Sequence, residues 1–299
     1  MKIGFTLPQI GPLGREAGEV MRFAEEAERL GADSLWVADR LLAPVEPTVG
    51  YAGGDTIPDV FHDVLDPFAV MSAAAAVTER VEIGTNVLVA SWYAPAVLAR
   101  SMTTIDRLSG GRLIVGLGTG WSPEEYRAAG VPMHERGARL DECLDILQAW
   151  WSDNPVVYSG KHWTVPASRV DLKPAREPRP PVYLGGFAPA ATRRVAQRAD
   201  GWLPVHVPEW GRFDPAAVTG PLTRIRELAR DAGRDPSELG VVLRVYPGSA
   251  ASLDGVLDTV ALARSDGAIE HAFVELMNVA HTVDHALEVV DRVLRAARR

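Results

Sequence analysis

Short apolar segments alternate with longer amphipathic segments along most of the chain. The short segments are rich in apolar and β-branched residues and predict strands at 2–7, 34–37, 81–87, 113–117, 182–185, 201–205, 241–245 and 272–276. The longer segments predict helices at 16–30, 67–77, 95–108, 124–129, 135–151, 189–199, 215–232, 253–265 and 282–298. Strands that alternate with helices pair in parallel, and eight such units in 299 residues predict a closed (β/α)8 barrel, the TIM barrel, rather than an open sheet.

Two stretches interrupt this alternation. Residues 41–65 follow the second predicted strand and are rich in Pro, Gly and Asp, whereas residues 152–181 follow the fourth unit and contain a predicted hairpin at 156–165. Both are short and the barrel pattern resumes after each, so we expect insertions after strands 2 and 4 of a single domain spanning 1–299. Long ordered loops often serve a function, so 41–65 is a candidate lid over the barrel mouth, with a plain surface excursion as the alternative.

The segment 113–126, LIVGLGTGWSPEEY, is the first candidate ligand loop. An apolar strand runs into Gly116, Gly118 and Gly120, and a helix restarts at the Ser-Pro-Glu-Glu sequence that begins at Ser122. The loop therefore lies at the carboxyl end of a strand, where barrels carry their chemistry. Its glycines let a flat or anionic ligand approach the backbone, and Trp121 adds an aromatic surface; a tight turn that binds nothing is the alternative.

A second loop, 181–191, repeats the pattern with Gly185, Gly186 and a helix that starts at Pro189. Backbone N–H groups that are free at glycines and at a helix start form a natural phosphate seat. Neither loop matches the dinucleotide fingerprint or the Walker sequence, so the phosphate of a flavin-like cofactor fits better than a nucleotide triphosphate.

Composition and charge narrow the function classes. The net charge of −8 and the lack of a basic run argue against partners such as nucleic acid or an anionic membrane surface. No apolar stretch approaches 18 residues, so we expect a cytoplasmic protein. The single Cys143 lies on an amphipathic helix and is interpreted as core packing. HExxH, paired cysteines and clustered carboxylates are missing from the sequence, so we expect no metal site.

Several motifs occur in an order that resembles one family. They are KIGFTLPQ, LGADSLWVADR, RVEIGTNVLVASWYAP, TTIDRLSGGR, GLGTGWSPEEY, VYLGG and ADGW, spread from residue 1 to about residue 202. Together they resemble the bacterial luciferase-like monooxygenase superfamily, and more narrowly its oxidoreductases that depend on the deazaflavin coenzyme F420. The resemblance implies an insertion-bearing barrel that binds the cofactor at the carboxyl ends of its strands.

The resemblance also implies which residues hold the cofactor. The ring is expected against the third strand, at Thr85, Asn86 and Val87, where the Asn86–Val87 peptide should be cis or bulged. Gly118, Thr119 and Gly120 are expected to line the cofactor cavity beside Trp121, while Gly185 and Gly186 hold the phosphate.

Asp39 matches the acidic residue of the family near the reactive face of the ring. The residues alone support this position, because a carboxylate directly after a buried strand points into the mouth; capping of the next segment or pairing with Arg40 is the alternative.

The departures from the family pattern concern the substrate. Many relatives have His where this chain has Arg40, and arginine stays charged, so Arg40 is expected to stabilise an anionic ring or substrate. Sugar-phosphate dehydrogenases of the family have a glutamate where this chain has Trp121, and a lysine after strand 6 that is missing from 202–208. The mouth is instead expected to be aromatic, with Trp92, Tyr93, Trp121, Trp202 and Trp210, and to suit a flat or apolar molecule.

His206 and His281, which follow strands 6 and 8, are both candidate proton donors. The predicted function is hydride transfer between coenzyme F420 and a small organic substrate by Asp39, Arg40 and His206. An FMN-dependent monooxygenase is the alternative, and a barrel that binds flavin without turnover is the third. Members of the family are commonly dimers, so a homodimer is expected.

Overall fold

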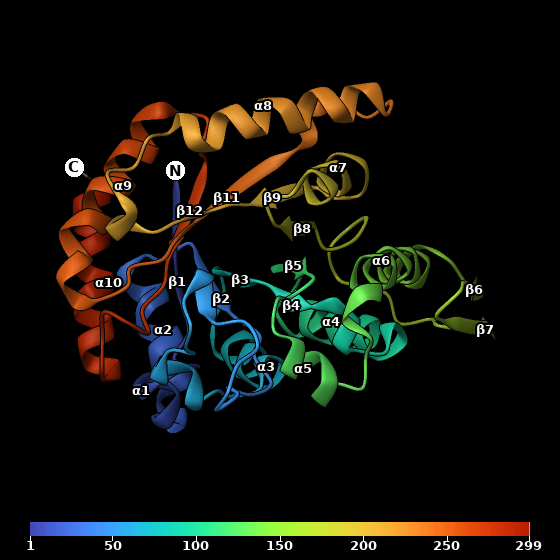
Figure 1. The fold of residues 1–299 in the computed structure, drawn as a ribbon, viewed down its shortest axis with the longest axis horizontal. Coiled ribbons are helices and arrows are strands. Elements are labelled where there is room, and N and C mark those ends of the chain that lie inside the picture. Colours follow the sequence, from blue (N-terminus) through green and yellow to red (C-terminus); the bar gives the residue numbers. More distant parts are fainter. Residues whose placement is uncertain (299) are drawn as a thin grey trace.

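The structure is a computed structural model that describes residues 1–298 and forms a closed parallel barrel (Figure 1). The barrel strands are β1 (Lys2–Thr6), β2 (Ser34–Val37), β3 (Glu82–Thr85), β5 (Leu113–Gly118), β8 (Val182–Gly185), β9 (Gly201–Leu203), β11 (Gly240–Val245) and β12 (His271–Val274). Each pairs in parallel with the next, and pairing of β12 with β1 closes the ring. Two short strands, β4 (Leu88–Val89) and β10 (Val205–His206), extend the pairing toward the mouth. The predicted (β/α)8 barrel is confirmed.

Helices surround the barrel. They are α1 (Pro12–Arg15), α2 (Val20–Leu30), α3 (Pro67–Val77), α4 (Pro95–Leu108), α5 (Pro123–Ala128), α6 (Arg136–Ser152), α7 (Pro189–Arg198), α8 (Ala216–Asp231), α9 (Leu253–Asp266) and α10 (Val283–Ala297). Many begin where the sequence supplies a start signal: proline opens α3, α4, α5 and α7, and the side chains of Asp66, Ser122 and Thr282 cap α3, α5 and α10. In the part of the chain that is described, no helix has both the length and the apolar character needed to cross a bilayer.

Two irregular regions stand out from the barrel. The connection from β2 to α3 spans residues 38–66 and contains the short 3-10 helices η2 (Tyr51–Gly53) and η3 (Asp59–His62). A hairpin of β6 (Val156–Ser159) and β7 (Thr164–Ser168) lies between α6 and β8 and projects at the edge of the molecule far from α9 and α10 (Figure 1).

Large side chains fill the part of the barrel interior that lies away from the carboxyl ends of the strands. Trp36 on β2 is fully buried and stacks on Phe273 of β12, with ring centroids 4.6 Å apart and planes 14° from parallel. The indole N–H donates to the hydroxyl of Ser34, which also bonds the ring of His271. A Cβ on Gly84 would lie 2.4 Å from the Trp36 ring, so the indole fits only because β3 carries no side chain there. This layer fills the barrel interior before the carboxyl ends of the strands, so only those ends are open.

We therefore expect Gly84→Ala to destabilise the protein, because its methyl group collides with a fully packed indole ring. Overpacking of this kind costs about 1–3 kcal/mol, which lowers the melting temperature by several degrees. Gly220→Ala is the matched control, since Gly220 lies on the exposed face of α8, where an added methyl group would have no atom within 4 Å, and should be neutral or slightly stabilising. Equal melting temperatures of the two variants by circular dichroism would contradict this account of the packing.

Candidate active site

Two adjoining cavities open at the carboxyl ends of the barrel strands. The inner cavity measures about 130 Å³ and includes Asp39, Arg40, Asn86 and Trp92 in its lining. The outer cavity measures about 560 Å³ and lies between the 38–66 connection and the ends of β10 and β11. Tyr51, Trp121 and Arg244 line both cavities and therefore form the wall between them.

Asp39 lies two residues after the end of β2 and lines the inner cavity, with 9% of its surface exposed. Its carboxylate accepts a hydrogen bond from the backbone N–H of Val89 at 2.9 Å and from the hydroxyl of Tyr93 at 3.0 Å. Burial raises the pKa of Asp39 to about 7, because loss of water outweighs the stabilisation by these two donors. A carboxyl group of this kind is part protonated near neutral pH and can give or take a proton.

Arg40 forms a buried ion pair with Glu125 of α5. The Nε atom of Arg40 lies 3.3 Å from Oε1 of Glu125, and both side chains are almost fully buried. The guanidinium lies between the rings of Phe61 and Trp121, with its carbon 4.8 Å from each ring centroid. Burial lowers the pKa of Arg40, although an arginine remains charged, and burial raises the pKa of Glu125.

A second ion pair joins the neighbouring strands β11 and β12 on the inner side of the barrel. Arg244 of β11 and Glu275, one residue past β12, lie 2.8 Å apart between Nη2 and Oε1. The amide of Asn86 also donates to Glu275, at 3.4 Å. The guanidinium of Arg244 lies over the ring of Tyr246, 4.6 Å from its centroid. Burial is the largest effect and lowers the pKa of Arg244, but Glu275, Tyr51 and Tyr246 together outweigh it and the net shift is upward.

The inner cavity contains buried donors without a partner. Trp92 Nε1 and Arg244 Nε lack a hydrogen-bond partner within residues 1–298, whereas Arg40 Nε has only its ion-pair contact with Glu125, and all three side chains line this cavity. Unpaired buried donors are costly, so they favour a ligand edge that carries acceptor atoms. The carbonyl-bearing edge of a flavin or deazaflavin ring has such acceptors. A cavity of about 130 Å³ accommodates an edge and not a whole cofactor.

The glycine loops surround Val87. A Cβ on Gly118 would lie 2.5 Å from Cγ2 of Val87, and a Cβ on Gly185 would lie 3.4 Å from Cγ1. The Asn86–Val87 peptide bond is cis, as the resemblance implies. Val87 therefore joins the lining of the inner cavity to both predicted cofactor loops, which come from β5 and β8.

The predicted cofactor residues divide into two groups. Asp39, Arg40, Asn86, Val87, Gly120 and Trp121 line the inner cavity. The lining of either cavity does not include Thr85, Gly118, Thr119, Gly185 or Gly186. The Thr85 side chain is fully buried, and its hydroxyl bonds both the backbone carbonyl and the N–H of Gly116, so it links β3 to β5 and does not face a ligand.

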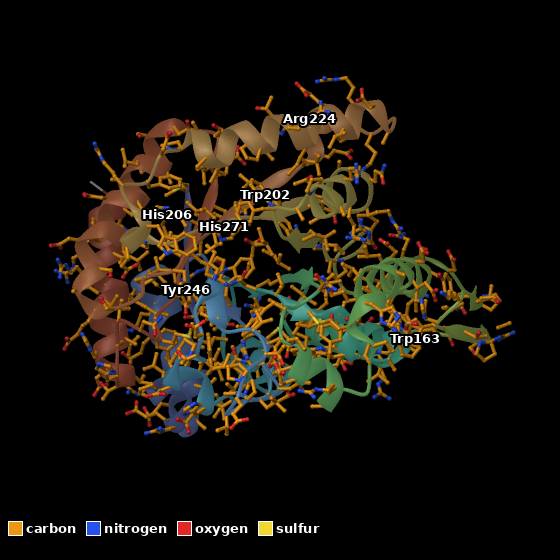
Figure 2. The ribbon with its side chains drawn as sticks, in the orientation of Figure 1. Trp163, Trp202, His206, Arg224, Tyr246 and His271 are labelled. Carbon is orange, nitrogen blue, oxygen red and sulfur yellow. The ribbon has the colours of Figure 1, made fainter. Side chains whose placement is uncertain are left out.

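Three further predicted residues lie outside the lining of both cavities. His206 points away from both cavities: its ring packs edge-on against Phe213 at 4.9 Å, and burial lowers its pKa. Trp202 is fully buried between barrel and helices and donates to the carbonyl of Gly186, so it is not part of the aromatic mouth (Figure 2). His281 is exposed and lines neither cavity.

Sequence reasoning missed Glu125, Arg244 and Glu275. The sequence presents Glu125 only as an acidic residue in the first turn of a helix. Its carboxylate also accepts hydrogen bonds from the backbone N–H groups of Leu41 at 2.8 Å and Leu42 at 3.4 Å. Arg244 and Glu275 are charged residues inside predicted apolar strands, and that mismatch was an available signal.

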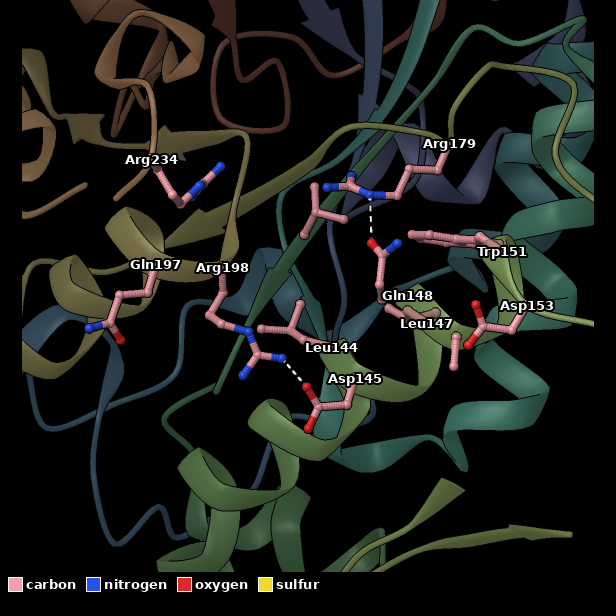
Figure 3. A pocket seen from close by; sticks show the side chains of 12 residues that line it. Leu144, Asp145, Leu147, Gln148, Trp151, Asp153, Arg179, Gln197, Arg198 and Arg234 are labelled. Atoms are coloured by element: carbon pink, nitrogen blue, oxygen red, sulfur yellow. Dashed lines mark hydrogen bonds and ion pairs between the residues drawn. The ribbon is translucent and has the colours of Figure 1, made fainter. Parts of the chain in front are cut away.

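A further cleft lies between α6 and α7, near the start of β8, and measures about 500 Å³ (Figure 3). Its arginines are already engaged: Arg179 bonds Gln148 and Asp200, Arg198 pairs with Asp145, and Arg234 donates to the carbonyl of Ala196. This cleft is remote from the carboxyl ends of the strands, so we do not assign the active site to it.

Comparisons with known proteins identify the family of this chain. The family model described as luciferase-like monooxygenase matches residues 1–294. An uncharacterized protein from Mycobacterium tuberculosis is 31% identical over 226 residues, which cover 73% of this chain and 74% of that protein. An F420-dependent glucose-6-phosphate dehydrogenase from Amycolatopsis mediterranei is 30% identical over 211 residues, 68% of this chain and 57% of the dehydrogenase.

Among solved structures, the monooxygenase RslO1 from Streptomyces bottropensis superposes with a TM-score of 0.74. The match covers 99% of this chain and 97% of that one at 21% sequence identity. At this identity the likeness establishes the barrel fold alone.

The raised pKa of Asp39 predicts a pH-dependent stability. In the unfolded chain an aspartate has a pKa of about 3.9, so folding takes up a proton between that pH and about 7. This proton makes its full contribution to the free energy of unfolding below about pH 4. The contribution falls as the pH rises from about 4 and is lost above about pH 7. We expect Asp39→Asn to remove this loss, so that the variant gains on the order of 2–3 kcal/mol relative to wild type between pH 5 and pH 8.

Thermal melts of both proteins at pH 5 and pH 8 measure this difference. Asp55→Asn is the control, because Asp55 is an exposed carboxylate in the same connection. If the melting temperatures of the Asp39 variant and the wild type differ by the same amount at the two pH values, the carboxyl group of Asp39 has an ordinary pKa.

Proposed function

The chain belongs to the luciferase-like monooxygenase family, and we propose that it is an oxidoreductase that transfers hydride between coenzyme F420 and a small organic substrate. The observation that carries this proposal is the inner cavity itself. It combines a carboxyl group with a pKa of about 7, a buried guanidinium at Arg40 and unpaired N–H donors, all at the carboxyl ends of the strands.

The roles of the residues follow from their positions. When bound, the deazaflavin supplies the hydride chemistry. Trp92 and Arg244 carry the unpaired donors available to acceptor atoms of the ring, and Arg40 adds a buried guanidinium beside Glu125. Asp39 holds or releases a proton at its carboxyl oxygens, where the Val89 N–H and the Tyr93 hydroxyl fix its orientation. The aromatic wall of Tyr51 and Trp121 limits the access of water to this site.

Coenzyme F420 is preferred over FMN because motifs of the chain resemble deazaflavin-dependent members and because a dehydrogenase named for F420 is 30% identical over 211 residues. The substrate of that relative is not transferred to this chain. This chain has Trp121 where the sugar-phosphate dehydrogenases of the family have a glutamate. Residues 202–208, which follow strand 6, contain no lysine. A homodimer in the cytoplasm remains our proposal from the family resemblance.

The choice of cofactor is tested by titration of the purified protein with oxidised F420 and, separately, oxidised FMN. We expect saturable quenching of tryptophan fluorescence with F420, because Trp92 and Trp121 line the inner cavity, and little change with FMN at the same concentrations. Tight binding of FMN without binding of F420 would make an FMN-dependent monooxygenase the leading function.

The phosphate seat is tested at Gly185. Gly186 itself is unsuitable because its φ of 117° strains any larger residue and a Cβ there would lie 2.9 Å from Cβ of Ala191. Gly185 has no such constraint, and its added methyl would meet only Val87 at 3.4 Å. We expect Gly185→Ala to fold normally and to weaken F420 binding by about tenfold, the effect of losing about 1.4 kcal/mol.

Gly137→Ala is the matched control for that variant. Its methyl would also meet one side-chain neighbour at a similar distance, 3.5 Å, but it lies in α6, outside the loop. Unchanged F420 affinity in the Gly185 variant, or an equal loss in both variants, would rule out this loop as the phosphate seat.

A further inference from the structure

The outer cavity is apolar except at one point. Valine, proline, glycine and aromatic residues form most of its lining, and Arg244 is the only charged residue among those that line it. Asn278 is the one amide, and its side-chain N–H donates to the carbonyl of Pro247. The chemistry of a ligand in this cavity is therefore decided by the state of Arg244.

The charge of Arg244 is already compensated. Glu275 lies 2.8 Å from its Nη2 atom, and the side chain of Glu275 is 2% exposed. The Tyr246 ring below the guanidinium holds it in place. However, the Nε–H group has no partner in the described chain, so the guanidinium keeps unused donor capacity although its charge is neutralised.

The charge of Arg40, the other arginine that lines the inner cavity, is also compensated. Arg40 is paired with Glu125, and its guanidinium is enclosed by Phe61 and Trp121. A ligand in the outer cavity therefore meets a largely apolar surface whose one cation, Arg244, already has a carboxylate partner. A buried anion without such a partner is strongly disfavoured, whereas a neutral oxygen accepts the free hydrogen bond.

We propose that the outer cavity binds the substrate, and that the substrate is a neutral, largely apolar organic molecule whose carbonyl or hydroxyl oxygen accepts a hydrogen bond from Arg244. The identification as substrate rests on the proposed function, whereas the binding chemistry rests on the cavity alone. Its volume of about 560 Å³ lies within the range of small-molecule sites. Arg244 also lines the inner cavity, so an oxygen held there lies beside the proposed site of hydride transfer.

Three probes of one shape separate the contributions of oxygen and charge. Calorimetric titration of the wild-type protein would use 2-acetylnaphthalene, which is a neutral ketone, naphthalene, which has no oxygen, and 2-naphthoate, which is an anion. We expect the ketone to bind about three- to tenfold more tightly than naphthalene, the gain of one hydrogen bond. Naphthoate should bind at least about tenfold more weakly than the ketone. Naphthoate binding as tight as the ketone would overturn the proposal.

A matched pair of variants locates the probe. Val49 lines the outer cavity and is 46% exposed, whereas Val45 belongs to the same connection, is 98% exposed and lines neither cavity. Val49→Trp fills part of the outer cavity and should weaken ketone binding at least about fivefold, while Val45→Trp should leave it unchanged. Equal affinities in the two variants would place the probe elsewhere and contradict the proposal.

The role of Arg244 is tested by removing both charges together, because removing one would leave its partner buried and unpaired. In Arg244→Met combined with Glu275→Gln, the preference for the ketone over naphthalene should disappear while naphthalene still binds. A preference retained in a folded double variant would exclude Arg244 as the donor.

Titration of the same samples with F420 separates the two proposals. If F420 does not bind but the probe order and the Val49 effect hold, the proposed function fails and the cavity assignment stands. If F420 binds and the probe order is not observed, the cavity assignment fails alone.

Discussion

The packing inside the barrel determines where this protein can bind a ligand. A ring of eight parallel strands encloses a narrow interior, and side chains at alternate positions must fill it. Here Trp36 and Phe273 stack across that interior, and Gly84 provides the space for the indole. This layer lies before the carboxyl ends of the strands. The residues two positions further along each strand therefore face the open mouth of the barrel.

That upper level carries charge, and the charge is balanced locally. Arg244 lies two residues after the inward-facing Val242, and Glu275 two residues after Phe273, so the pair forms directly above the packed layer. Two buried charges are tolerated there because each neutralises the other, and because Asn86 adds a hydrogen bond to the carboxylate. Asp39 differs from these residues, since it has donors but no cation bonded to it. This difference explains why burial raises the pKa of Asp39 to about 7.

Much of the fold was predictable from the sequence, but only part of the site. Helix starts were recognised because Pro67, Pro95 and Pro189 mark them chemically, and strands because apolar runs alternate with these helices. The direction of each side chain was harder to predict. Barrel strands are apolar on both faces, so the pattern does not reveal which residues point inward.

Two residues illustrate this limit. Arg244 points into the mouth and His206 points out of it, although both lie near the ends of strands that pair with each other. Only the register of the closed barrel decides between these directions. The ion pair of Arg40 with Glu125 was also out of reach, because it joins residues 85 positions apart through the contact of two loops.

The contacts of α5 link the two halves of the site. Glu125 accepts hydrogen bonds from the backbone at Leu41 and Leu42, and the neighbouring Glu124 accepts them from the backbone and hydroxyl of Thr48. Two adjacent carboxylates therefore hold the connection after β2 against the loop after β5.

This attachment has a consequence for both cavities. The connection after β2 supplies Tyr51 and the loop after β5 supplies Trp121, and the two rings lie 5.6 Å apart in the wall between the cavities. Trp121 precedes α5 directly in the chain, and the connection that carries Tyr51 is bonded to the carboxylates of α5. Both sides of the wall between the cavities are therefore anchored to one short helix.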